Sequence, residues 1–127
     1  MECLDKYYFE TVVGAQISDM STQPIIPYSS IVICFLDSLS KLLLKDHTIR
    51  NYPDVVGFGY WCRKSNLLSL ARNFSTEQFR IGRGLAFHIA PGNVPVKFAF
   101  SLAFGMLSGN SNIVRISDKK FEQSEII

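Results

Sequence analysis

Gly84-Leu-Ala-Phe-His-Ile-Ala-Pro-Gly-Asn-Val-Pro95 is the stretch of sequence that decides the predicted fold. Its first half is apolar and predicts a short strand, and its second half is a loop bracketed by two prolines with Asn93 at the apex. The apolar run over residues 96–108 predicts a helix, and residues 112–117 predict a second strand. A strand, a loop, a helix and a strand in this order build a parallel sheet, so we expect an α/β fold.

The two predicted strands place polar residues at one edge of that sheet. Ligands of open parallel sheets bind beyond the carboxyl ends of the strands. The loop over residues 91–95 follows the first strand, and Arg115 lies near the end of the second strand. We therefore expect an amide, a guanidinium and backbone N–H groups to share one site at this edge.

Asn93 has two interpretations. Its amide offers two N–H donors without a charge, and donors aimed at a carbonyl oxygen stabilise the negative charge that develops when a nucleophile adds. The alternative is that Asn93 caps the following helix or tolerates a tight turn. Pro91 and Pro95 stiffen the loop in either case, and Gly92 lets a ligand approach the backbone closely.

The remaining charged candidates also have two interpretations each. Arg115 can present its planar fork of donors to a phosphate, or it can be a surface arginine that pairs with Asp118 or Glu122. We interpret His88 as a core or sheet-face histidine, in preference to a catalytic base. Arg80 and Arg83 are interpreted as part of a solvated approach loop, with phosphate binding as the alternative.

These motifs resemble a known superfamily. Pro91-Gly-Asn-Val-Pro95 and Gly109-Asn-Ser-Asn-Ile-Val-Arg-Ile-Ser117 resemble the start of the nucleotide-binding domain of aldehyde dehydrogenases, where a tryptophan replaces Gly92 and a lysine replaces Arg115. The resemblance to LuxC-type acyl-CoA reductases is closer, because Tyr52-Pro-Asp-Val-Val-Gly-Phe-Gly-Tyr-Trp-Cys-Arg-Lys64 is also similar to them. This resemblance covers residues 28–127.

The resemblance implies a fold, a reaction and a cofactor. The fold would be a Rossmann-like, aldehyde-dehydrogenase-type nucleotide-binding domain that is incomplete within this chain. The enzyme would be an oxidoreductase that reduces a long-chain fatty acyl-CoA, or another acyl thioester, to an aldehyde through a cysteine acyl-enzyme. The cofactor would be NADPH, with NADH as the alternative. The nucleophilic cysteine is expected downstream, so this chain alone should be inactive or nearly so.

The resemblance also implies roles for particular residues. Asn93 would stabilise the oxyanion, and the adenosine side of the cofactor site would be lined by Ala90, Pro91, Gly92, Arg115, Ser117 and Asp118. Arginine at position 115 favours the 2′-phosphate of NADPH, whereas Asp118 favours the free 2′-hydroxyl of NADH. Ser117 either bonds the ribose or caps a last helix that we expect to begin at residues 117–118.

Composition narrows the class of protein. The chain has 127 residues, of which 47% are hydrophobic and 19% charged, so we expect a globular domain. A formal charge of +2 is too small to indicate nucleic-acid binding. The cysteines at positions 3, 34 and 62 lack metal-ligand spacing, so we predict no metal site. With no signal peptide and no apolar run near 20 residues, we expect a soluble, cytoplasmic protein without a membrane span.

The predicted organisation has two parts. Residues 1–27 form an N-terminal arm, which is β-like over residues 7–17, and a linker. Residues 28–127 form one domain. That domain starts with an amphipathic helix over residues 28–45 and a second helix over residues 53–73. Because a parallel strand at 112–117 needs a further crossover, we expect the front part of a longer polypeptide, with a self-sufficient domain as the alternative. The alternative function is a non-catalytic α/β module, or an inactive fragment, that assembles with a partner chain or as a homo-oligomer.

Overall fold

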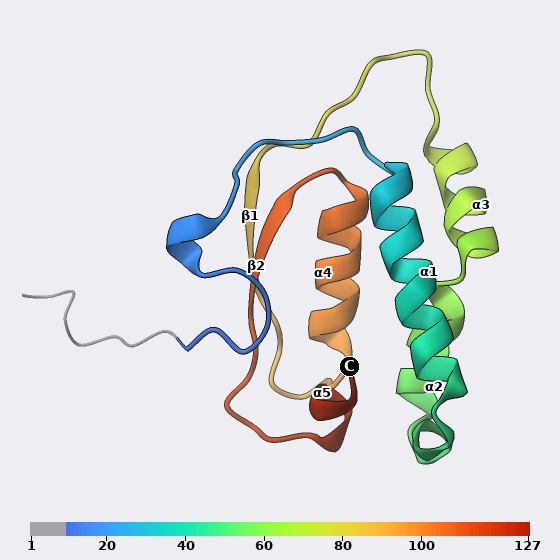
Figure 1. Ribbon diagram of the computed structural model, residues 1–127, viewed down its shortest axis with the longest axis vertical. Helices are drawn as coiled ribbons and strands as arrows, with labels where there is room; N and C mark the ends of the chain where they lie inside the picture. The colour runs from blue at the N-terminus through green and yellow to red at the C-terminus, as the bar shows by residue number, and fades with distance from the viewer. Residues whose placement is uncertain (1–9) are drawn as a thin grey trace, which may run out of the picture.

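The structure, a computed structural model, describes residues 10–127 (Figure 1). These residues form five α-helices, two short 3₁₀ helices and one two-stranded sheet. The mixed α/β class predicted from the sequence is therefore confirmed. In chain order the elements are η1 (Ile17–Asp19), α1 (Ser30–Lys45), η2 (His47–Asn51), α2 (Pro53–Trp61), α3 (Lys64–Phe74), β1 (Leu85–Ile89), α4 (Lys97–Leu107), β2 (Ser111–Arg115) and α5 (Glu122–Ile126).

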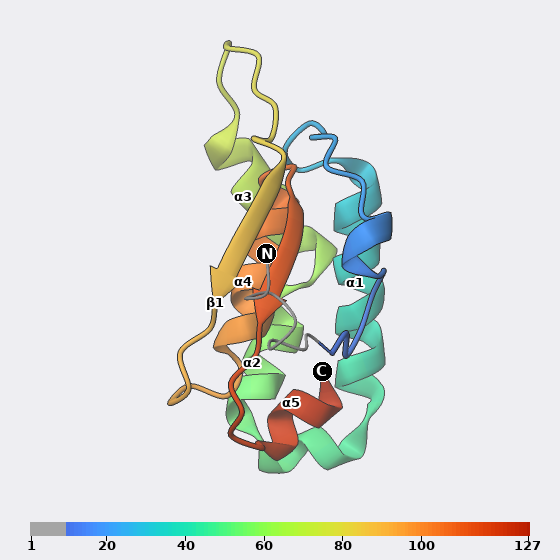
Figure 2. The same ribbon diagram turned by 90° about the vertical axis from the view of Figure 1, so that its left-hand side faces the viewer.

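Helix α4 forms the middle of three layers. The sheet covers one side of α4, and α1, α2 and α3 cover the other side (Figures 1 and 2). A helix that is apolar nearly all round suits this position, and its small residues Ala99, Ala103 and Gly105 are buried there. Two strands do not define a larger nucleotide-binding sheet, so the Rossmann-like arrangement stays a prediction.

The two strands are parallel, as the order of the elements predicts. Their register runs from Leu85 opposite Ser111 to Ile89 opposite Arg115, and α4 makes the crossover between them. Gly109 follows the cap residue of α4, Ser108, and has φ at +83°, a left-handed conformation that residues other than glycine rarely adopt. The sheet unit expected from the quoted stretch is therefore present.

A glycine junction ties the N-terminal segment to the sheet unit. The Ile25 N–H donates to the Gly109 carbonyl at 2.9 Å, and the Gly82 N–H donates to the Ile25 carbonyl at 3.0 Å. A Cβ atom on Gly109 would overlap the Ile25 carbonyl oxygen, and one on Gly82 would overlap the Gly109 carbonyl. Glycine is needed at both positions because three backbone segments meet here.

Replacing Gly109 with alanine is expected to lower the free energy of unfolding by about 2 kcal/mol, because the side chain meets both a positive φ and a backbone oxygen. Gly57→Ala is the matched control, since nothing lies within 4 Å of a Cβ atom at that helical position. The control should raise stability by up to about 1 kcal/mol. Urea denaturation followed by circular dichroism gives the free energy of unfolding of both variants. Equal effects of the two substitutions would contradict the requirement for glycine at the junction.

The hydrophobic core lies between the helical layer and α4. Its fully buried side chains include Leu36, Val55, Phe58, Leu67 and Leu107. Phe58 contacts the Phe100 ring edge-on, with 4.9 Å between ring centroids, and so joins α2 to α4. The buried Ser40 hydroxyl of α1 donates to the Gly59 carbonyl of α2 at 2.6 Å. The core therefore holds α1, α2 and α4 together.

The helix predicted over residues 53–73 is in fact two helices. It is interrupted at Cys62 and Arg63, between α2 and α3. The Asp37 carboxylate of α1 accepts the Lys64 backbone N–H at 2.9 Å, and the Asn66 side chain donates to the Trp61 carbonyl at 2.7 Å. These bonds satisfy backbone groups that a break in a helix would otherwise leave without partners.

Two further predictions differ from the structure. The described part of the β-like arm, residues 10–17, forms no strand and leads into η1, while residues 7–9 lie outside the described residues. The last helix begins at Glu122, not at residues 117–118. In its place the Ser117 hydroxyl accepts the Lys119 N–H at 3.2 Å, which makes a local turn. The division of the chain at residue 27 stays a prediction.

Candidate functional site

The carboxyl ends of β1 and β2 lie side by side. Ile89 pairs with Arg115 as the last residue pair of the sheet, and the Ala90 N–H donates to the Arg115 carbonyl at 3.2 Å. The loop over residues 91–95 and the segment over residues 115–118 therefore leave the sheet from the same edge. This is the juxtaposition on which the sequence-based site depends.

Gly92 and Ser117 are in close approach at this edge. A Cβ atom built on Gly92 would come within 2.8 Å of the Ser117 hydroxyl oxygen. A side chain at position 92 would therefore need the Ser117 hydroxyl to rotate away, so glycine leaves room for the segment that follows β2, which the sequence did not indicate.

Asn93 is exposed at the apex of the loop. The first turn of α4 follows Val96, and no side chain caps it, so the capping part of the alternative is wrong. Asn93 does lie in a turn with Gly92, as the other part of that alternative predicts. Among residues 10–127, the side-chain amides of Asn66, Asn110 and Asn112 form hydrogen bonds, whereas that of Asn93 forms none. Both of its N–H donors can therefore be directed at a bound ligand.

Arg115 is half-exposed and forms the surface pair that was one of its two interpretations. Its Nη2 lies 3.9 Å from Asp118 Oδ2, with 54% of the arginine side chain and 96% of the aspartate side chain accessible. An ion pair with this exposure contributes little to stability. The guanidinium can leave Asp118 for a phosphate at small cost, so the two interpretations of Arg115 are compatible.

His88 lies on the sheet face that packs against α4. Its Nε2 is 2.9 Å from Asn112 Oδ1, and Asn112 Nδ2 donates to the Asn110 carbonyl at 2.7 Å. Because the amide nitrogen of Asn112 is the donor in that second bond, its oxygen accepts from His88, which places the proton on Nε2. A Cβ atom on Gly105 of α4 would overlap Asn112 Oδ1. The sheet-face interpretation of His88 is confirmed.

Asn112 is a polar residue that the sequence analysis missed. A signal was present, because Asn110 and Asn112 alternate at the start of a strand and a glycine lies in the facing helix. Strand alternation places such residues on one face of the sheet, where a glycine makes room for them.

Two cysteines, Cys34 and Cys62, lie among the described residues, and neither belongs to a strand or to the loop over residues 91–95. Cys62 at the end of α2 is fully buried, and burial raises the pKa of its thiol to about 12. That thiol stays protonated near neutral pH and is a poor nucleophile. Cys34 on α1 is exposed. Within residues 10–127, no three His, Cys, Asp or Glu side chains are grouped to hold a metal ion. No described helix is both long and apolar enough to cross a membrane.

The fold and the site define a class of protein. Polar residues at the carboxyl edge of parallel strands are the arrangement used by ligand-binding α/β proteins. The family model described as acyl-CoA reductase (LuxC) matches residues 61–126, which include both strands, the loop and Arg115. The chain belongs to the LuxC acyl-CoA reductase family, as its motifs predicted. No curated protein and no solved structure is significantly similar to it.

Proposed function

We propose that this chain supplies the oxyanion donor and part of the cofactor site of an NADPH-dependent acyl-CoA reductase. The reaction converts an acyl thioester, with a long-chain fatty acyl-CoA as the expected substrate, to an aldehyde. One observation carries the proposal: within the region matched by the family, the loop with Asn93 and the strand end with Arg115 leave the same edge of the sheet.

Asn93 acts on the carbonyl oxygen of the thioester. A cysteine thiolate elsewhere in the active enzyme attacks the carbonyl carbon, the C–S bond to coenzyme A breaks, and the acyl group is held as a new thioester. NADPH supplies the hydride that reduces this group to the aldehyde and restores the thiolate. Each addition puts negative charge on the carbonyl oxygen, and the uncharged amide of Asn93 donates to it.

In this proposal the adenosine half of the cofactor binds at the carboxyl ends of β1 and β2. Ala90 is buried where the loop begins, Pro91 and Gly92 follow it, and the Ser117 hydroxyl lies against Gly92. Arg115 is accessible and can bind a 2′-phosphate with two N–H groups. Asp118 would accept a hydrogen bond from a free 2′-hydroxyl, so the same site could also bind NADH.

Replacing Arg115 with alanine is expected to raise the dissociation constant for NADPH by about 10- to 100-fold, since a charge-assisted hydrogen bond contributes about 1.5–3 kcal/mol. The dissociation constant for NADH should change less than twofold. Titration of cofactor fluorescence in the active enzyme measures both. Lys119→Ala is the control, because it removes an exposed positive charge a few residues away. Unchanged NADPH affinity, or equal losses for the two cofactors, would contradict the assignment.

A second candidate function is a non-catalytic module that assembles with another chain. It is favoured by the outer face of β1, where Leu85, Phe87 and Ile89 are 49%, 56% and 68% exposed. Parallel sheets are normally covered on both faces, so such a surface favours a partner. Light scattering after size exclusion, combined with cofactor titration, separates the candidates, because a module of this kind would associate without binding NADPH.

A further inference from the structure

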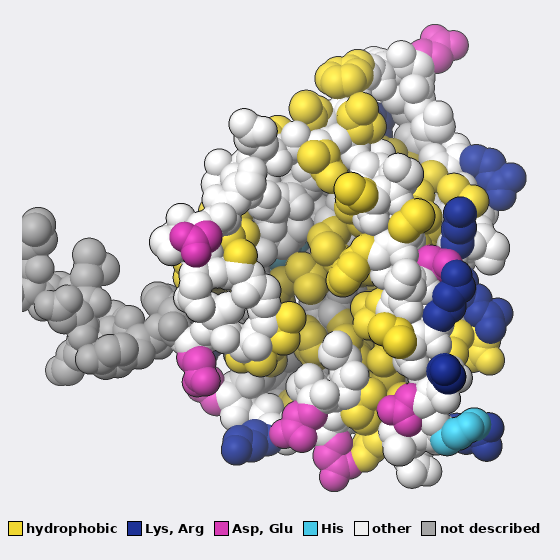
Figure 3. Space-filling model, viewed as in Figure 1, with side chains coloured by type: hydrophobic (Ala, Val, Ile, Leu, Met, Phe, Trp, Pro, Cys, Tyr) yellow, Lys and Arg dark blue, Asp and Glu magenta, His cyan; other side chains and the backbone are white. Residues whose placement is uncertain are grey.

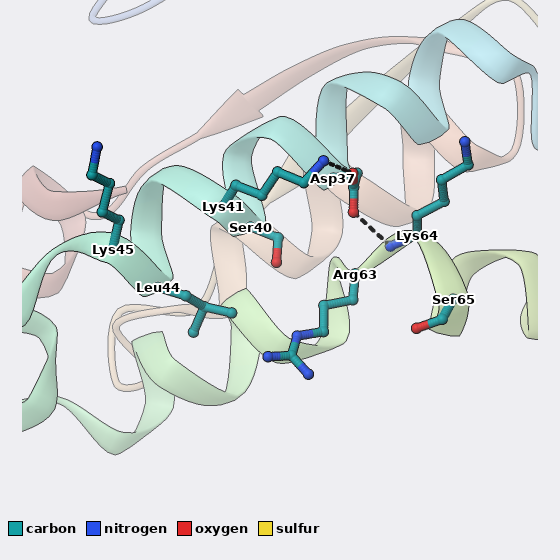
Figure 4. Close-up of a pocket in the computed structure, with 8 residues that line it drawn as sticks. All are labelled: Asp37, Ser40, Lys41, Leu44, Lys45, Arg63, Lys64 and Ser65. Atoms are coloured by element: carbon teal, nitrogen blue, oxygen red, sulfur yellow. Dashed lines mark hydrogen bonds and ion pairs between the residues drawn. The ribbon is translucent and has the colours of Figure 1, made fainter.

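A groove of about 470 Å³ lies between α1 and the start of α3. Figure 4 shows the side chains around it, and four of them are cationic: Lys41, Lys45, Arg63 and Lys64. In Figure 3, Lys and Arg gather along the right-hand flank of the molecule, over the helical layer. The groove is on the opposite side of α4 from the sheet, so it is separate from the site at the carboxyl edge.

Most of the positive charge at this groove has no acidic partner. Asp37 is the one carboxylate that lines the groove. It already binds the Lys41 Nζ at 2.7 Å and the Lys64 backbone N–H at 2.9 Å, and these bonds hold the pKa of its carboxyl below its ordinary value. Among the described residues, the side-chain charges of Lys45, Arg63 and Lys64 form no salt bridge. The surface is therefore complementary to a negatively charged partner.

The positions of these charges favour an extended ligand. Lys45 and Lys64 project from the two ends of the groove, and Arg63 extends along the opposite side from Lys41 (Figure 4). The Arg63 guanidinium is held over the Tyr60 ring, 4.2 Å from its centroid. Charges that are spread in this way, and do not meet at one point, match several acidic groups along a ligand better than one phosphate.

Apolar surface accompanies the charge. Leu44 lines the groove, and Tyr60, under Arg63, is 51% exposed. Protein interfaces combine such apolar and aromatic contacts with a charged rim, and Tyr and Arg are enriched in them. The formal charge of the whole chain is only +2, which gives no general affinity for polyanions. We propose that this groove is a docking surface for an acidic amphipathic helix of a partner protein.

The test uses the full chain and a fluorescein-labelled synthetic helical peptide with Glu on one face and Leu on the other. Fluorescence anisotropy gives its dissociation constant. Neutralising the two ends of the groove with the double substitution Lys45→Gln and Lys64→Gln should raise that constant by about tenfold. The matched control is the double substitution Lys119→Gln and Lys120→Gln, which removes the same charge from exposed positions outside the groove and should change it less than twofold.

Two further measurements identify the occupant. Peptide binding should shift the backbone amide NMR signals of residues 41–45 and 63–65, and raised salt should weaken it. Arg63→Lys should change the affinity little, because a helix partner needs the charge but not the planar fork. The proposal is overturned if the peptide does not bind, or if both double variants weaken binding equally. It is also overturned if inorganic phosphate or an oligothymidine binds more tightly than the peptide with the same dependence on Lys45 and Lys64.

Discussion

Replacing Asn93 with alanine is expected to lower the turnover number for thioester reduction by about 10²–10³-fold, the loss that follows removal of one oxyanion donor. Asn93 is exposed and lacks a hydrogen-bond partner among residues 10–127, so its removal should change the free energy of unfolding by less than about 0.5 kcal/mol. The measurement is the acyl-CoA-dependent loss of NADPH absorbance, at saturating substrate, in the active enzyme that contains this chain.

Two variants control the Asn93 result. Asn93→Asp keeps the size of the side chain but places a negative charge beside the developing oxyanion, so its turnover should be as low as that of the alanine variant. Asn73→Ala removes another exposed asparagine, at the end of α3, and should leave turnover unchanged. If Asn93→Ala raised KM with the turnover number intact, Asn93 would bind substrate and transition state equally, and the oxyanion role would be wrong.

The second large effect concerns stability. Phe58→Ala is expected to lower the free energy of unfolding by about 3–5 kcal/mol, the usual cost of emptying an aromatic site in a core. Phe58 is 1% exposed and contacts the Phe100 ring, so it links α2 with α4. Urea denaturation followed by circular dichroism gives the loss. In a small domain this is a large fraction of the total stability.

Phe35→Ala is the matched control for Phe58. It removes the same side chain from the outer face of α1, where Phe35 is 54% exposed, and the loss should stay below about 1 kcal/mol. Similar losses for the two variants would mean that the core is not organised around the contact between α2 and α4.

The sheet unit could be predicted from sequence because its signals are local. An apolar strand, a proline-bracketed loop, an apolar helix and Gly109 follow one another within a short stretch, and each selects its own backbone conformation. Ligands of parallel sheets bind beyond the carboxyl ends of the strands, and this rule predicts the edge of the sheet at which Asn93 and Arg115 lie. Family membership rests on the same stretch.

The features that were missed depend on contacts between residues far apart in the chain. The break between α2 and α3 is stabilised by Asp37 of α1, which bonds to Lys64, 27 residues later in the chain. The room that Gly92 leaves is occupied by the hydroxyl of Ser117, in the segment that follows β2. Asn112 forms a hydrogen bond with His88 on the neighbouring strand, and its side chain fits against α4 only because residue 105 is a glycine. Periodicity along the sequence can place a residue such as Asn112 on one face of the sheet, but it does not identify the distant residue that it contacts.

The glycine junction has a practical consequence for anyone who shortens this protein. Ile25 connects the backbone before β1 to the backbone after α4, through hydrogen bonds to Gly82 and Gly109. A shortened version should therefore begin upstream of Pro24, because a start at α1 would expose the amino ends of both strands to water and to competing chains.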